Sequence, residues 1–167
     1  MRNLRRKKRG IFRIKCERHN DLPLKNMLTC SKTYSDIPFG HRQPNHNGHC
    51  RFIHGHNWAI TLTFSAEKLD ENGFVVDFGN LKYIKKWIDD NIDHACVLSF
   101  ADECFGLFSK SPFFKVYGVE DCSCEGLAKF FFETFNQMVI DKEGGRVKVS
   151  QLILLEDSKN YATYSSK

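Results

Sequence analysis

The sequence predicts an α+β protein with an antiparallel sheet and two amphipathic helices. Two segments with the alternation of strands come first, two with helical spacing follow, and two further strand-like segments end the chain. Strands that follow one another as hairpins, with the helices grouped between them, are typical of α+β folds with an antiparallel sheet. The length of 167 residues suits one domain, and 41% hydrophobic residues are enough to fill its core.

The clearest strand is predicted over residues 52–64, where apolar and polar positions alternate. An earlier strand is expected over 27–39, closed by Pro38, and residues 40–49 are expected to form a loop rich in Gly, Pro and Asn. In the 52–64 strand one face carries Phe52, His54, His56, Trp58, Ile60, Leu62 and Phe64.

Helices are predicted over 80–92 and 123–140, because apolar residues recur there at helical spacing. The segment between them, 95–122, is expected to be irregular. Residues 146–156 are expected to form a strand, "DSKN" a turn and "YATYSS" an edge strand.

Residues 1–26 form a basic leader with ten Lys/Arg against two acids, whereas residues 27–167 carry fifteen against eighteen. We interpret the leader as a disordered, solvated tail or as a stretch upstream of a true start at Met27, and 27–167 as the domain. Contact of the leader with nucleic acid is the less favoured alternative. The chain has no run of apolar residues long enough for a membrane span. Seven cysteines without CxxC pairing indicate reduced thiols and a cytoplasmic protein.

The stretch "HCRFIHGHN" places two histidines one residue apart at the head of the 52–64 strand. Residues i and i+2 of a strand project to the same side, so His54 and His56 lie together at the margin of the core. Neutral imidazole in such a place is a good zinc ligand, and catalytic zinc usually takes three protein ligands. The candidates for the third ligand are His41, His46, His49 and His94. The alternative is that the pair is only hydrogen-bonded at a sheet edge.

Five motifs stand in order over about residues 28–164: "HCRFIHGHN", "ENGFVVDFGNLK", "IDH", "CEGLAKF" and "LLED". Together they resemble the 6-pyruvoyltetrahydropterin synthase / 6-carboxytetrahydropterin synthase family. The resemblance implies the tunnelling fold, a four-stranded antiparallel sheet with two helices packed on one face. It also implies a homo-oligomer, a hexamer of two stacked trimers, with active sites at subunit interfaces.

The resemblance also implies the site residues. It assigns Zn²⁺ to His41, His54 and His56, with His41 on the first strand in "PFGHRQ". It makes Cys50 the general base, helped by a relay of Asp93 and His94, and it makes Glu156 the anchor of the pterin ring. A carboxylate can accept two N–H bonds from the 2-amino-pyrimidinone edge of that ring. Glu125, in the first turn of the second helix, is interpreted as structural.

The position of Cys50, four residues before His54, resembles the 6-carboxytetrahydropterin branch, since the pyruvoyl branch has six. The implied reaction is that of a carbon–carbon lyase. It converts 7,8-dihydroneopterin triphosphate to 6-carboxy-5,6,7,8-tetrahydropterin, acetaldehyde and triphosphate, for 7-deazaguanine compounds such as queuosine. The alternatives are a 6-pyruvoyltetrahydropterin synthase and a non-catalytic zinc- and pterin-binding protein. The chain departs from the family pattern at "CSC" (122–124), at Asp157 and at Ser99, which puts the choice of substrate in doubt.

Overall fold

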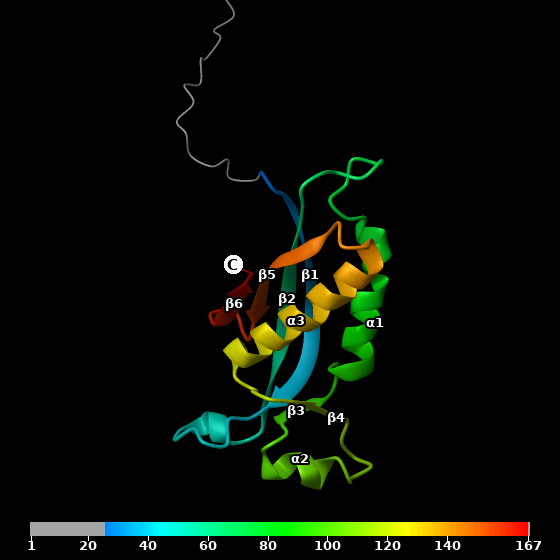
Figure 1. Ribbon diagram of the computed structural model, residues 1–167. Helices are drawn as coiled ribbons and strands as arrows, with labels where there is room; N and C mark the ends of the chain where they lie inside the picture. Colours follow the sequence, from blue (N-terminus) through cyan, green and yellow to red (C-terminus); the bar gives the residue numbers. More distant parts are fainter. Residues whose placement is uncertain (1–25, 167) are drawn as a thin grey trace, which may run out of the picture.

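The longest antiparallel pair of the sheet joins β1 (Leu28–His41) to β2 (His54–Ala66), in the computed structural model that describes residues 26–166. The sheet has six strands in the order β4-β3-β1-β2-β5-β6 (Figure 1). Strands β1, β2, β5 and β6 are neighbours in that order and pair antiparallel. Strand β3 runs parallel to both of its neighbours, β1 and β4. The other elements are η1 (His49–Arg51), η2 (Phe78–Leu81), α1 (Lys82–Asn91), β3 (Cys96–Ser99), α2 (Glu103–Phe108), β4 (Val116–Val119), α3 (Cys124–Glu143), β5 (Lys148–Leu155) and β6 (Tyr161–Ser165).

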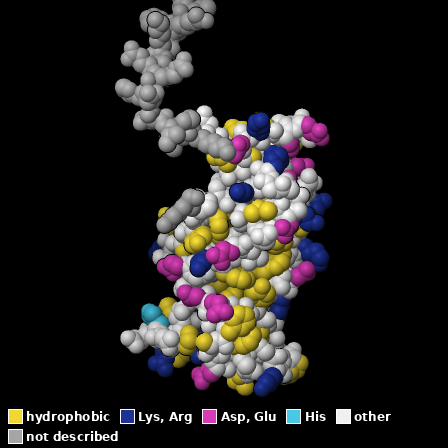
Figure 2. Space-filling model, in the orientation of Figure 1, with side chains coloured by type: hydrophobic (Ala, Val, Ile, Leu, Met, Phe, Trp, Pro, Cys, Tyr) yellow, Lys and Arg dark blue, Asp and Glu magenta, His cyan; other side chains and the backbone are white. Residues whose placement is uncertain are grey.

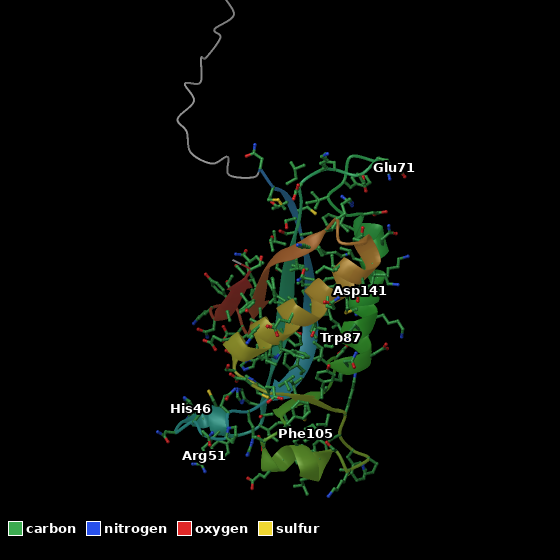
Figure 3. The ribbon with its side chains drawn as sticks, viewed as in Figure 1. His46, Arg51, Glu71, Trp87, Phe105 and Asp141 are labelled. Atoms are coloured by element: carbon green, nitrogen blue, oxygen red, sulfur yellow. The ribbon has the colours of Figure 1, made fainter. Side chains whose placement is uncertain are left out.

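Helices α1 and α3 cover one face of the sheet, and α2 lies beside β3 and β4 at one end of the molecule (Figure 1). Trp87 of α1 lies between the two covering helices (Figure 3), where its ring makes edge contacts with Phe131 and Phe135 of α3. Phe135 is fully buried, and Trp87 packs against the same core. The two helices are therefore bound to each other as well as to the sheet.

The alternation predicted for β2 is confirmed from His54 onward. Trp58, Ile60, Leu62 and Phe64 are all fully buried under the helices. The opposite face carries hydroxyls, since Thr61 pairs with Thr33 through a hydrogen bond of 2.8 Å between their side chains. The strand begins at His54 rather than at residue 52, and Phe52 is 60% exposed. Phe52 ends the η1 turn instead, since its N–H donates to the carbonyl of His49.

Strand β1 is longer than its composition predicts. It passes through Pro38 and ends at His41, so that residues 40 and 41 belong to the strand and not to the loop. Proline is tolerated there because no strand pairs with that part of the outer edge of β1 until Gly40 meets Cys96 of β3, and the Pro38 carbonyl alone accepts a hydrogen bond, from the N–H of His94. A bulge between Tyr34 and Ile37 changes the alternation, so that Ile37 and His41 face the core together with Tyr34.

The segment 95–122, expected to be irregular, contains β3, α2 and β4. The strands β3 and β4 have only four residues each, too few for a periodic pattern to be recognised. They pair in parallel from Cys96↔Val116 to Ser99↔Val119, and this contact between segments distant in the sequence defines them as strands. The sheet is therefore six-stranded and mixed rather than four-stranded and antiparallel, and the chain has three α-helices rather than two in the part that is described.

On the face in view, acidic and basic side chains are interspersed with apolar ones (Figure 2). Across residues 26–166, no helix combines the length and the apolar character needed to cross a membrane. The basic leader, apart from Asn26, lies outside the described residues.

Candidate metal centre and cavity

Three histidines predicted as metal ligands meet at the end of the β1–β2 pair. His41 ends β1 directly opposite His54, the first residue of β2, and His56 follows on the same face of β2. Their ring centroids are 4.6 Å apart for His41 and His54, 5.0 Å for His54 and His56, and 5.4 Å for His41 and His56. The strands can approach closely because Gly40 faces Gly55, and a Cβ on Gly40 would meet the carbonyl of His54 at 3.3 Å.

The backbone orients two of these rings. The Nδ1–H of His41 donates to the carbonyl oxygen of Cys122 at 2.9 Å, and that of His54 donates to the carbonyl of Phe52 at 2.9 Å. Metal-bound histidines generally donate their second ring N–H to such an acceptor, which fixes the tautomer. The Nε2 atoms are left free, and those of His41 and His56 are buried without a hydrogen-bond partner. Buried polar atoms of this kind are rare unless a ligand satisfies them.

Burial lowers the pKa of His41, whose side chain is only 3% exposed. The neighbouring His54 and His56 lower it further, while the hydrogen bond to Cys122 and the carboxylate of Glu156 act in the opposite direction. The lowered pKa keeps this imidazole neutral at neutral pH, which is the form that binds metals.

The carboxylate of Glu156 completes the cluster. Glu156 follows the last residue of β5, and its Oε1 lies 3.3 Å from Nε2 of His41 and 3.4 Å from Nε2 of His56. One ligand atom from each of the four residues lies within 4.8 Å of the others. Three histidine nitrogens and a carboxylate oxygen are a donor set that suits Zn²⁺. The residues therefore fit the metal that the resemblance implies, on the independent ground of their unpartnered Nε2 atoms.

A cavity of about 420 Å³ opens beside this cluster. His41 and Glu156 line it, together with Cys50 of η1. Cys50 is exposed and free. The segment that carries η1 projects from the molecule, with histidine at its surface (Figure 2) and with His46 and Arg51 upon it (Figure 3). A volume of this size suits a small-molecule substrate.

Asp93 and His94 form the predicted pair directly after α1. The Nδ1 of His94 lies 2.5 Å from Oδ1 of Asp93, and the His94 side chain is 80% exposed. His94 has a left-handed backbone (φ 58°) and its N–H donates to the carbonyl of Pro38 at 2.7 Å. His94 borders a second, shallow hollow that is also lined by His56 and does not include Cys50. In the described part of the chain no hydrogen bond joins Cys50 to this pair.

Several cavity residues were not predicted as site residues. Glu125, interpreted as structural, lines the same cavity as Cys50, and so do Gln43 and Cys124. The sequence holds a signal for Glu125, its place in the first turn of a helix that begins at the cavity. Gln43 is the last residue of the "PFGHRQ" stretch that carries His41, but nothing in that stretch marks it as a cavity residue.

The departures from the family pattern serve local structure. The hydroxyl of Ser123 accepts from the N–H of Gly126 and caps α3. Cys124 is half-buried, which raises the pKa of its thiol to about 12, and its Sγ contacts the carbonyl of Leu154. Asp157 accepts from the backbone N–H groups of Lys159 and Asn160, so its carboxylate shapes the β5–β6 turn.

A family model described as 6-pyruvoyl tetrahydropterin synthase matches residues 29–167. A 6-carboxy-5,6,7,8-tetrahydropterin synthase of Rickettsia typhi is 41% identical over 81 residues, which are 48% of this chain and 58% of the relative. A relative of the same name from Aquifex aeolicus is 30% identical over 125 residues, 71% of this chain and 76% of its own length. The chain thus spans little more than half of the length of the Rickettsia relative.

Solved structures with this fold include an uncharacterized protein from Wolinella succinogenes, with a TM-score of 0.73 at 19% identity, covering 85% of this chain and 99% of that one. The 6-pyruvoyl tetrahydropterin synthase of Caenorhabditis elegans has a TM-score of 0.60 at 21% identity, over 85% of this chain and 97% of its own. These likenesses show the fold alone. With the family model covering nearly the whole described chain, and with the relative from Aquifex aeolicus, they lead to one conclusion. The chain belongs to the 6-pyruvoyl tetrahydropterin synthase family.

Proposed function

We propose that the protein is a zinc-dependent lyase that converts 7,8-dihydroneopterin triphosphate to 6-carboxy-5,6,7,8-tetrahydropterin, acetaldehyde and triphosphate. The observation that carries the proposal is a cluster of three histidines and a carboxylate, with Nε2 of His41 and of His56 unpartnered, beside a cavity that an exposed thiol also lines. The relatives from Rickettsia typhi and Aquifex aeolicus bear the name of this activity.

Each group has a separate task in the proposed reaction. His41, His54 and His56 would hold the ion, and bound Zn²⁺ supplies Lewis-acid polarisation of the hydroxyls on the substrate side chain. Glu156 anchors the pterin ring by accepting N–H bonds from its 2-amino-pyrimidinone edge. Cys50, as thiolate, removes a proton from the side chain of the substrate.

Asp93 orients the imidazole of His94, which relays the proton. The 2.5 Å contact between Asp93 and His94 supports this part of the relay. Cys50 lines the cavity and His94 lines the second hollow. The thiol of Cys50 and the Asp93–His94 pair of the same chain therefore do not meet in one pocket. We therefore propose a homo-oligomer, a hexamer of tunnelling-fold subunits, in which Cys50 of one copy meets the Asp93–His94 pair of a neighbouring copy.

Cleavage of a carbon–carbon bond is favoured over simple triphosphate elimination by the place of Cys50, four residues before His54. The product would enter the synthesis of 7-deazaguanine compounds such as queuosine. All six described cysteines are free, which supports a cytoplasmic location.

The experiment is to incubate the zinc-loaded protein with 7,8-dihydroneopterin triphosphate, to identify the pterin product by mass and to assay acetaldehyde. Acetaldehyde together with 6-carboxytetrahydropterin would support the proposal. 6-Pyruvoyltetrahydropterin without acetaldehyde would assign the protein to the other branch, and unchanged substrate would point to a non-catalytic zinc- and pterin-binding protein.

A further inference from the structure

The contact between Glu156 and the histidines is not a hydrogen bond. Oε1 of Glu156 approaches Nε2 of His41 to 3.3 Å, yet that nitrogen has no hydrogen-bond partner. The proton of the neutral His41 ring lies on Nδ1, which donates to the carbonyl of Cys122. A lone pair of nitrogen therefore faces a carboxylate oxygen, an arrangement that is unfavourable unless a cation lies between the two atoms.

The distances themselves suit two ligands of one ion. Zinc bonds to histidine nitrogen and carboxylate oxygen are 2.0–2.2 Å long, so neighbouring ligand atoms of a tetrahedron lie about 3.3–3.5 Å apart. Oε1 of Glu156 lies 3.3 Å from one Nε2 and 3.4 Å from another. The same oxygen thus stands at ligand-to-ligand distance from both His41 and His56.

We propose that Glu156 is the fourth ligand of the resting metal centre, and that it leaves the ion to bind the pterin edge when substrate arrives. The proposal rests on the proposed function for the second of these two roles. A carboxylate cannot fill both roles with the same oxygen, so binding of the pterin ring frees a coordination position. The side chain has room for this exchange, because it is 23% exposed and borders the cavity.

This arrangement would link recognition to opening of the centre. A resting site with four protein ligands is closed, as structural zinc sites are, whereas three protein ligands leave one position for substrate. Only a molecule that presents N–H donors to Glu156 would draw the carboxylate away. The centre would then be shielded from other ligands until a pterin occupies the cavity.

The test compares Glu156→Ala with Glu125→Ala in the full-length protein, since both carboxylates line the same cavity. Zinc affinity is measured by competition with a chelating dye, and thermal unfolding of the apo forms shows that the variants fold. We expect Glu156→Ala to weaken Zn²⁺ binding at least about tenfold and Glu125→Ala less than about twofold. Equal losses in both variants, or unchanged affinity in Glu156→Ala, would overturn the proposal.

A second readout uses Co²⁺ in place of Zn²⁺ and pterin, a ring without the substrate side chain, as the probe. Addition of pterin should change the visible spectrum of wild-type protein, because the ring draws Glu156 from the ion, and it should leave the Glu156→Ala spectrum unchanged. A wild-type spectrum that does not respond would refute the exchange. Zinc affinity does not depend on turnover, so the two proposals can fail separately. If the wild-type protein is inactive but Glu156→Ala still weakens Zn²⁺ binding, the proposed function is refuted and the role of Glu156 as a ligand is not.

Discussion

A single hydrogen bond decides which nitrogen of His41 is available to a metal. The carbonyl of Cys122 takes the Nδ1 proton, and Nε2 is turned toward His54, His56 and Glu156. The acceptor is a backbone atom from a segment 81 residues away in the chain. Because any residue has a carbonyl, the "CSC" departure at that position does not disturb the orientation of the ring.

In the proposed reaction, Cys50 is the residue whose replacement should separate catalysis from metal binding. Cys50→Ala should lower turnover at least about 100-fold, because a general base in the transition state contributes 10²–10⁴-fold. The protein should keep its zinc, since the four-residue cluster does not include Cys50. Product formation and bound zinc, measured on the same preparation, check the prediction. Loss of zinc would mean that Cys50 is a ligand and that its role as a base is wrong.

At the scale of the element, the loop after α1 is held by a lysine from the segment that precedes β4. Nζ of Lys115 donates to the carbonyls of Asp89 and Asp93, each at 2.8 Å. These carbonyls lie at the end of α1, where a cation is also favoured by the helix dipole. The bonds brace the turn in which His94 adopts its left-handed backbone.

Lys115→Met should therefore loosen this loop. We expect a loss of about 1 kcal/mol in the free energy of unfolding, and faster hydrogen exchange at the amide of His94. The kcat should fall while KM and zinc content stay unchanged, and Lys115→Arg should restore it. Lys110→Met, an exposed lysine of the same segment, is the matched control. Equal effects of the two variants on kcat would contradict the positioning role.

Helix α2 begins at a buried carboxylate. Asp102 is 5% exposed, accepts from Nε of Arg42 at 2.7 Å, and caps α2 by accepting from the N–H of Cys104 at 2.8 Å. Burial acts to raise the pKa of Asp102, but these hydrogen bonds outweigh it and the pKa is lowered. A lowered pKa means that the ionised carboxylate stabilises the fold above the ordinary pKa of aspartate, and that this stabilisation is lost as the pH falls through the lowered value.

Asp102→Ala should lower the free energy of unfolding by about 2–3 kcal/mol at neutral pH, through the lost cap and the unpaired Arg42. The difference from wild type should shrink as the pH falls from about 4 through the lowered pKa of Asp102, because the carboxylate is protonated first in the unfolded chain and then in the folded protein. Urea unfolding at several pH values measures this. Glu103→Ala serves as the control, since Glu103 is an exposed second partner of Arg42 at 3.6 Å. A difference that is constant with pH would show that the ionised carboxylate is not the stabilising form.

At the scale of the whole molecule, the separation of Cys50 from His94 makes a prediction about assembly. If each active site takes Cys50 from one copy and His94 from another, two inactive variants should complement each other. Cys50→Ala and His94→Ala, unfolded together and refolded as a mixture, should regain up to about a quarter of wild-type activity, since random assembly restores that share of the interfaces.

Each variant refolded alone is the control for this mixture and should stay inactive. Size-exclusion chromatography with light scattering establishes that the mixture is oligomeric. A fully assembled but inactive mixture would show that the relay forms within one chain or does not involve His94.

The sequence by itself determined the elements whose pattern is local and long. The alternation of β2 and the helical spacing of α1 and α3 are repeated over enough residues to be read without knowledge of their neighbours. The spacing of His54 and His56 placed them on one face for the same reason. The family resemblance added His41 as a third metal ligand, although composition alone predicts that residues 40–49 form a loop.

Only the tertiary structure decided what depends on contacts between distant segments. The four-residue strands β3 and β4 exist through their pairing, and a pattern of period two is not visible over so few residues. The approach of Glu156 to His41, 115 residues apart, results from the alignment of β5 with β2 and of β2 with β1. The placing of Cys50 and His94 on different hollows has the same origin, because loops at the ends of strands are positioned by the sheet and not by their own sequence.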